Sequence, residues 1–197
     1  MTRIVCISAT SRPDNYTARA LSVVVDELTR SEIEVEVLDA RDLDLPFPGH
    51  PATEDSHRLL DAVVRSSALV LATPEYHGGY SAMAKLIIEN LGFPSALAEK
   101  PLALLGVAGG RIGAIKSLEQ LRAVCSHTGA LVLPRAVSIA GVRGAFDPDG
   151  TCTDPATERA LRGLAESLLD FLQNYVCPKH TLETMVREDG TPWVSSV

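Results

Sequence analysis

The chain has 197 residues, 46% of them apolar, and a formal net charge of −7. This length suits one compact domain with a sizeable core and requires no second domain. The negative charge disfavours nonspecific binding to nucleic acid and to anionic membranes, but it leaves room for a local positive site that binds a small anion.

The four cysteines are far apart in the sequence and form no CxxC motif or Cys/His cluster. This spacing argues against a structural zinc site or an iron–sulfur cluster, and we expect no metal site. Cys6 and Cys125 lie in a strand-like and a helix-like segment, where we expect reduced, packed thiols. The start of the chain lacks the apolar core of a signal peptide, and no apolar run reaches the roughly 18 residues that span a bilayer. We therefore expect a cytoplasmic protein.

The first part of the chain alternates between strand and helix patterns. Residues 4–8 form an apolar run, residues 18–28 place apolar side chains at helical spacing, and residues 34–38 alternate as a half-buried strand does. This succession predicts a parallel pair of strands with a right-handed crossover. The elements expected next are an irregular, proline-containing segment over 39–55, a helix over 56–66 and a third strand over 68–73.

The same alternation continues to the C-terminal part. Pro134 interrupts the fifth strand, which predicts an edge strand or a bulge. Together the five strands and five helices predict an α/β domain of three layers, with a five-stranded parallel sheet between helices, over residues 1–177. Residues 178–197 show little periodicity, and we expect an extension that packs on a neighbouring subunit or is loosely ordered. The remaining elements are expected over 82–91, 101–107, 114–127, 130–133 with 136–139, and 155–175.

Polar residues gather in the loop that follows the first strand, residues 9–17. Its hydroxyls, the amide of Asn15 and the guanidinium of Arg12 precede a helix, whose N-terminus attracts phosphate. The loop contains neither G-x-G-x-x-G nor G-x-x-x-x-G-K-[ST], which argues against a dinucleotide fold and a P-loop. A hydroxyl-rich loop of this kind suits a terminal phosphomonoester. The alternative is an ordinary capped turn between a strand and a helix.

Two further loops follow buried strands, at the sheet edge where open α/β sheets bind ligands. After residues 68–73 comes Pro74-Glu75-Tyr76-His77-Gly78-Gly79, whose glycines permit the close approach of a flat ligand. Tyr76 could stack on such a ligand. The simpler interpretation of His77 is a loop histidine without chemistry, and that of Glu75 is a solvated or turn-stabilising charge.

The third loop, over 108–113, begins Ala108-Gly109-Gly110-Arg111 and precedes a helix. Adjacent glycines allow the edge of a ligand to rest against backbone N–H groups, although a flexible turn would have the same sequence.

Together these loops resemble, in the same order, the motifs of the NADPH-dependent FMN reductase family. The resemblance covers about residues 3–175. It rests on three segments. The first segment, Ser8-Ala9-Thr10-Ser11-Arg12-Pro13-Asp14-Asn15-Tyr16-Thr17, resembles the family pattern G-S-x-R-x-x-S-x-N/T. The second, Thr73-Pro74-Glu75-Tyr76-His77-Gly78, resembles T-P-E-Y-N-G-S. The third, Gly109-Gly110-Arg111 with Leu118-Glu119-Gln120-Leu121-Arg122, resembles G-G-R-x-G-A…L-x-Q-L-R.

The resemblance implies a flavodoxin-like fold that binds FMN and takes hydride from NADPH or NADH. It also implies a small-molecule electron acceptor, such as a quinone, an azo compound, a metal oxyanion or free flavin, and a homodimer or homotetramer. It assigns no catalytic side chain. The cofactor-binding positions that it implies are Thr10, Arg12, Asn15, Tyr16 and Thr17 for the phosphate, Pro74, Glu75, Tyr76, His77 and Gly78 for the ribityl chain and ring edge, and Gly109 and Gly110 for the ring.

The sequence departs from the family at several positions. His77 replaces Asn and Gly79 replaces Ser, while the helix over 82–91 keeps Lys85 but changes several neighbours. Arg12 and Arg111 could each meet a phosphate, so NADPH and NADH stay open as reductants. Two other functions also stay open: a flavodoxin-type electron carrier without its own turnover, and a cofactor-free structural or regulatory domain on the same fold.

Overall fold

A parallel sheet forms the centre of the computed structural model, which describes residues 2–31 and 33–188. The main strand order is β2-β1-β3-β5-β6, while β7 also pairs with β5 and β4 pairs antiparallel with β3. Counting β6 and β7 as one position, this is the doubly wound order of flavodoxin-like folds, so the expected fold class is confirmed. The sheet has seven strands rather than the expected five. They are β1 (Arg3–Ser8), β2 (Glu34–Asp39), β3 (Ala68–Tyr76), β4 (Gly79–Tyr80), β5 (Pro101–Val107), β6 (Leu131–Val132) and β7 (Val137–Ile139).

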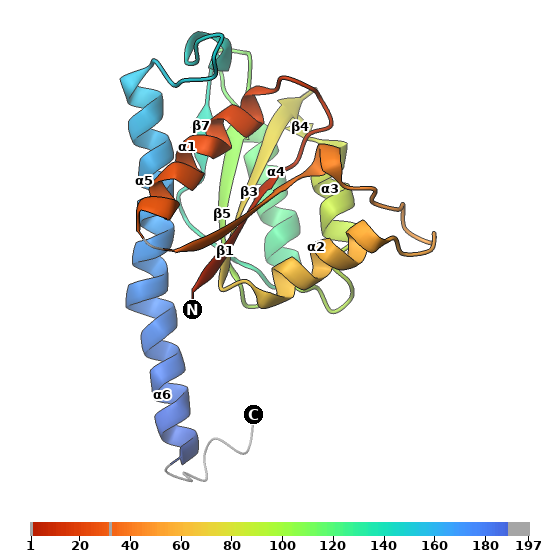
Figure 1. Ribbon diagram of the computed structural model, residues 1–197, viewed down its shortest axis with the longest axis vertical. Coiled ribbons are helices and arrows are strands. Elements are labelled where there is room, and N and C mark those ends of the chain that lie inside the picture. Colours follow the sequence, from red (N-terminus) through yellow and green to blue (C-terminus); the bar gives the residue numbers. More distant parts are fainter. Residues whose placement is uncertain (1, 32, 189–197) are drawn as a thin grey trace.

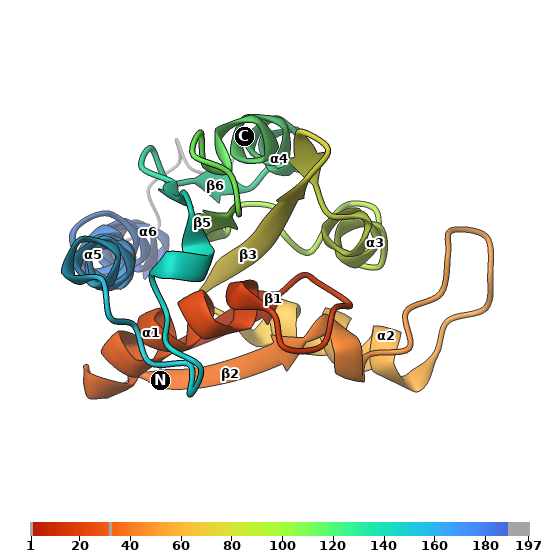
Figure 2. The ribbon, with the colours of Figure 1, turned by 90° about the horizontal axis from the view of Figure 1, so that it is seen from above.

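Helices cover both faces of the sheet and bury one core on each. Figure 2 shows α1 and α5 on one side of the central strands and α3 and α4 on the other. The first core joins α1 and α5 to the sheet, and the second joins α2, α3 and α4 to it. Because β3 and β5 are covered on both faces, they are the continuous apolar runs of the sequence. The helices are α1 (Tyr16–Arg30), α2 (Glu54–Arg65), α3 (Ala82–Glu89), α4 (Ile115–His127), α5 (Pro155–Phe171) and α6 (Cys177–Glu188).

The edge strand is split, as Pro134 predicts. Leu131 and Val132 pair with the start of β5, and Val137–Ile139 pair with its end. Proline has no N–H to donate to a ladder, so it lies in the gap between β6 and β7.

The last helix runs further than the sequence pattern indicates. After α5 the backbone continues through a π-helical turn, Leu172–Val176, into α6, which extends past the sheet (Figure 1). Residues 178–188 are therefore helical, and Pro178 lies just after the π-helical turn. Residues 189–197 lie outside the described part of the chain, and the boundary at residue 177 stays a prediction. Across residues 2–31 and 33–188, no helix is both long and apolar enough to cross a bilayer.

Cys6 and Cys125 are buried and free of disulfides, as expected. Burial raises the pKa of both thiols to about 12, because the thiolate would lose its hydration. Both side chains are therefore neutral packing groups.

The strand β3 extends three residues beyond its expected end. Glu75 pairs with Tyr80 and Tyr76 pairs with Gly79, which makes this segment a hairpin rather than an open loop. His77 and Gly78 form its two-residue turn, with φ of 52° and 77°. Positive φ at both positions is the signature of a type I′ turn, whose twist matches that of the flanking strands.

Ser81 joins the ends of β1 and β3 to the start of α3. Its buried hydroxyl donates to the carbonyl of Ala9, just after β1, and accepts the N–H of Ala84 at 3.1 Å as the N-cap of α3. Its own N–H donates to Thr73 Oγ1 at 3.0 Å. These bonds hold the first loop against the base of the hairpin.

We expect Ser81→Ala to lower the free energy of unfolding by about 1–3 kcal/mol, because it removes a cap and leaves a buried carbonyl without its donor. Urea unfolding followed by circular dichroism measures this change. Ser22→Ala is the matched control, since its hydroxyl is exposed and bonds only within α1, and a change below about 0.5 kcal/mol is expected there. Equal stability of Ser81→Ala and the wild type would contradict this role.

Candidate functional site

A cavity of about 420 Å³ opens at the carboxyl ends of the parallel strands. This volume lies in the range of small-molecule sites, and the position is the one where open α/β sheets bind ligands. Four segments from distant parts of the sequence form its wall, at or just after the carboxyl ends of β1, β3, β5 and β7. The lining residues are Arg12, Pro13, Asp14, Asn15, Tyr16, Thr17, Pro74, Glu75, Tyr76, Val107, Ala108, Gly109, Val142 and Arg143.

The start of α1 faces this cavity. Asn15 caps the helix: its Oδ1 accepts the N–H of Ala18 at 2.7 Å, and its Nδ2 donates to the carbonyl of Arg12 at 2.9 Å. The N–H groups of Tyr16 and Thr17 have no partner within the helix, as at every helix start. The first turn of α1 carries no acidic residue. The helix therefore presents partial positive charge to the cavity, which suits a phosphate.

Tyr76, at the end of β3, connects the first loop to the second. The guanidinium carbon of Arg12 lies 4.9 Å from the centre of the Tyr76 ring, a cation–π distance. The Tyr76 hydroxyl lies 3.3 Å from Thr10 Oγ1, which in turn accepts the N–H of Arg12 at 3.3 Å. Thr10 thus sits behind the wall, where it supports two residues that line the cavity.

Glu75 fastens the hairpin to α4. Its Oε2 accepts the N–H of Ser117 at 3.1 Å, in the first turn of α4, whose N-cap Ala114 makes no side-chain bond. Gln120 Nε2 adds a bond to the carbonyl of Gly78 at 3.0 Å. The carboxylate therefore stabilises the helix start from another element, which agrees with the expectation of a turn-stabilising charge more than with ligand contact.

Eight of the twelve positions implied by the family resemblance line the cavity, and four do not. Gly110 lies beside it in the third loop, and Thr10 lies behind it. His77 and Gly78 form the hairpin turn away from the lining, so the simpler interpretation of His77 agrees with its place in the turn. The eight lining positions are Arg12, Asn15, Tyr16, Thr17, Pro74, Glu75, Tyr76 and Gly109.

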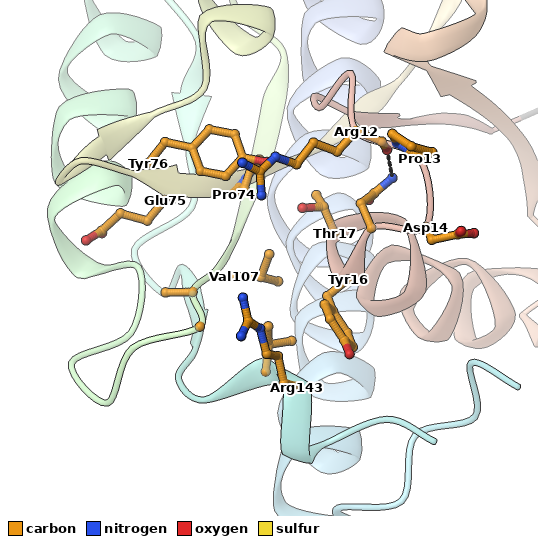
Figure 3. Close-up of a pocket in the computed structure, with 14 residues that line it drawn as sticks. Arg12, Pro13, Asp14, Tyr16, Thr17, Pro74, Glu75, Tyr76, Val107 and Arg143 are labelled. Atoms are coloured by element: carbon orange, nitrogen blue, oxygen red, sulfur yellow. Dashed lines mark hydrogen bonds between the residues drawn. The ribbon is translucent and has the colours of Figure 1, made fainter. Parts of the chain in front are cut away.

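The fourth wall segment, after β7, was not predicted from the sequence. Val142 and Arg143 lie in a short 3₁₀ turn, Val142–Gly144, and Arg143 lies across the cavity from Arg12 (Figure 3). No motif marks this segment. The available signal was topological: a loop that follows a parallel strand ends at the same sheet edge as the other three.

The charges around the cavity are arranged asymmetrically. Figure 3 shows the guanidinium groups of Arg12 and Arg143 turned toward the cavity, while the carboxylates of Asp14 and Glu75 point away from it. In a chain with a net charge of −7, this makes a local positive site. The arrangement favours an anionic ligand of small-molecule size.

Comparison with known proteins agrees with this geometry. The model of the family described as NADPH-dependent FMN reductase matches residues 2–143. An NADPH azoreductase from Bacillus sp. (strain OY1-2) is 31% identical over 147 residues, covering 71% of this chain and 78% of that protein. An FMN-dependent NADPH-azoreductase from Staphylococcus aureus (strain USA300) is 22% identical over 178 residues, covering 85% of this chain and 94% of that protein.

A solved structure shows the same fold at lower identity. FerB, a flavoenzyme NAD(P)H:(acceptor) oxidoreductase from Paracoccus denitrificans, superposes with a TM-score of 0.72 at 24% identity, covering 89% of this chain and 99% of that one. The family match spans most of the chain, and the 31% identical relative extends over a similar length. The chain therefore belongs to the NADPH-dependent FMN reductase family, oxidoreductases that use FMN and NADPH.

Proposed function

We propose that this protein binds FMN in the cavity and uses NADPH to reduce a small-molecule acceptor, such as a quinone, an azo compound, a metal oxyanion or free flavin. The observation that carries the proposal is the start of α1, which faces the cavity with no acidic residue in its first turn. Such a helix start is suited to the single phosphate of FMN.

The lining residues fit FMN in kind as well as in place. The N–H groups of Tyr16 and Thr17 and the guanidinium of Arg12 would hold the phosphate. Pro74, Tyr76 and Gly109 would border the ribityl chain and the ring. A Cβ added at Gly109 would meet nothing closer than 3.9 Å, and one at Gly110 would meet nothing within 4 Å, so this backbone is open to a ligand edge. Bound FMN would supply the hydride chemistry, which no side chain provides.

The contribution of the chain is binding and orientation. Among the described residues that line the cavity there is no histidine or cysteine, and the two carboxylates point away from it. Two hydrogen bonds join the hairpin to α4, one from the N–H of Ser117 to Glu75 and one from Gln120 to the carbonyl of Gly78. These bonds keep the second and third loops at a fixed separation. Fixed walls hold reactants in a reactive orientation without a general base.

The test uses the purified protein loaded with FMN. Under anaerobic conditions, we expect NADPH to bleach the visible flavin band rapidly, and a quinone or an azo dye to restore it through many turnovers. An electron carrier of the flavodoxin type would bind FMN but be bleached by NADPH only slowly. A protein that takes up no FMN would contradict the proposal altogether.

A second test addresses the tie between the hairpin and α4. We expect Glu75→Ala to raise the Kd for FMN several-fold and to lower stability by about 1 kcal/mol, because the α4 start loses its acceptor and the third loop loses its support. Glu75→Gln keeps an acceptor oxygen and is expected to stay close to the wild type. Flavin fluorescence titration and urea unfolding measure the two quantities. Unchanged FMN affinity in Glu75→Ala would show that this bond does not position the loop.

We also propose that the protein is a homodimer or homotetramer. Two large apolar side chains are exposed where the third loop leads into α4: Ile112 and Ile115 are 74% and 49% exposed. Exposed apolar side chains that lie near a cavity favour an interface with another subunit. Light scattering coupled to size exclusion should give two or four times the chain mass of 21.0 kDa. A monomeric mass at micromolar concentration would reject this proposal.

A further inference from the structure

The guanidinium of Arg143 lies at the cavity and has no hydrogen-bond or ion-pair partner within the described part of the chain. Its side chain lines the cavity, and its guanidinium points inward (Figure 3). Within residues 2–31 and 33–188 it makes no hydrogen bond or ion pair to the protein. Two other arginines differ from it: Arg162 pairs with Asp26, Glu27 and Glu158, and Arg122 donates to backbone carbonyls.

The segment that carries Arg143 is fastened on both sides. The N–H of Gly141 donates to the carbonyl of Gly110 at 3.0 Å, and that of Val142 to the carbonyl of Ala108 at 3.1 Å, which attach it to the third loop.

On the other side, the segment is attached to the start of α1. The Phe146 ring contacts that of Tyr16 with centroids 6.3 Å apart, and Arg19 donates to the carbonyl of Asp147 at 2.9 Å. The backbone of Arg143 is therefore held between the phosphate-loop side and the ring-loop side of the cavity, and its side chain is directed into the cavity before any ligand arrives.

The two inward guanidinium groups differ in how free they are. Arg12 lies over the Tyr76 ring, which occupies one of its faces and limits its orientation. Arg143 has no such contact, and its Nε lies 3.9 Å from where a Cβ on Gly109 would be. A planar guanidinium fork without a protein partner matches a group that offers several anionic oxygens in one plane or tripod.

We propose that Arg143 binds a phosphomonoester. This inference rests on the proposed function, which brings two such groups to the cavity: the terminal phosphate of FMN and the 2′-phosphate of NADPH. Each of these phosphates carries close to two negative charges and has three acceptor oxygens, so both suit the guanidinium. Substitution of Arg143 distinguishes them through two ratios, one of dissociation constants and one of kcat/KM values.

The experiment compares Arg143→Ala with the wild type. The first ratio is the Kd of riboflavin divided by that of FMN, from flavin fluorescence titration of the apoprotein; riboflavin lacks the phosphate. The second is kcat/KM for NADPH divided by that for NADH in the FMN-loaded enzyme; NADH lacks the 2′-phosphate. We expect one of these ratios to fall by about tenfold, which is the loss in binding expected when one charge-assisted hydrogen bond is removed. A fall in the first identifies the phosphate of FMN, and a fall in the second that of NADPH.

Two control variants separate this role from a general effect of charge. Arg135→Ala removes an exposed guanidinium that lies between β6 and β7, beside α5 and outside the cavity lining, and is expected to leave both ratios unchanged. Arg143→Lys keeps the charge but loses the fork, and is expected to recover part of the affected ratio. Both ratios unchanged in Arg143→Ala, with the wild type binding FMN, would overturn this inference alone. A wild type that binds no FMN would overturn the proposed function and this inference together.

Discussion

The hydrogen bonds of Ser81 set the geometry on which the site depends. Parallel strands bring their carboxyl ends to one edge, but they do not by themselves fix the loops that follow. Ser81 fixes the first two loops, because its hydroxyl donates to the carbonyl of Ala9 after β1 and accepts the N–H of Ala84 at the start of α3. The contacts of Thr10 and Arg12 with Tyr76 repeat this connection nearer the cavity. The distance between the first loop and the hairpin is therefore set by these contacts within the protein rather than by a ligand.

The helix starts of this chain differ in the negative charge placed beside them, and the start of α1 is one that lines the cavity. Acidic residues occupy the first turns of α2 and α5, and Glu75 reaches across from β3 to supply one to α4. Each places negative charge at the positive end of a helix, which is a stabilising arrangement. The start of α1 receives only the amide of Asn15. The first turn of α3 also carries no acidic residue, but its N-cap Ser81 is buried against the first loop, whereas the start of α1 lines the cavity.

Much of the fold was predictable because apolar runs indicate buried strands and turn residues indicate where those strands end. The buried strands β3 and β5 and the interruption by Pro134 all followed from periodicity. The hairpin was missed because Pro74 and the paired glycines Gly78 and Gly79 suggest a loop, whereas the positive φ of His77 and Gly78 closes a tight turn. The continuation of the last helix through a π-helical turn was missed because Pro178 suggested a break.

The site was predictable where a motif directly follows a strand. Arg143 belongs to no such motif, and it was not predicted. The role proposed for it depends on a guanidinium facing a cavity that three other segments create, and nothing adjacent in the sequence encodes that. Gly109 and Arg12 stand in segments that the resemblance to the family motifs marked in the sequence, and both lie within the part of the chain that the family model matches. The family match ends at residue 143, and the anchors of the Arg143 segment on its C-terminal side, Phe146 and Asp147, lie beyond it. Because the described lining contains no histidine or cysteine and its two carboxylates point away from the cavity, we expect discrimination among reactants to come from shape and charge. The segment after β7 supplies one of the two guanidinium groups that face the cavity, so we expect it to take part in that discrimination.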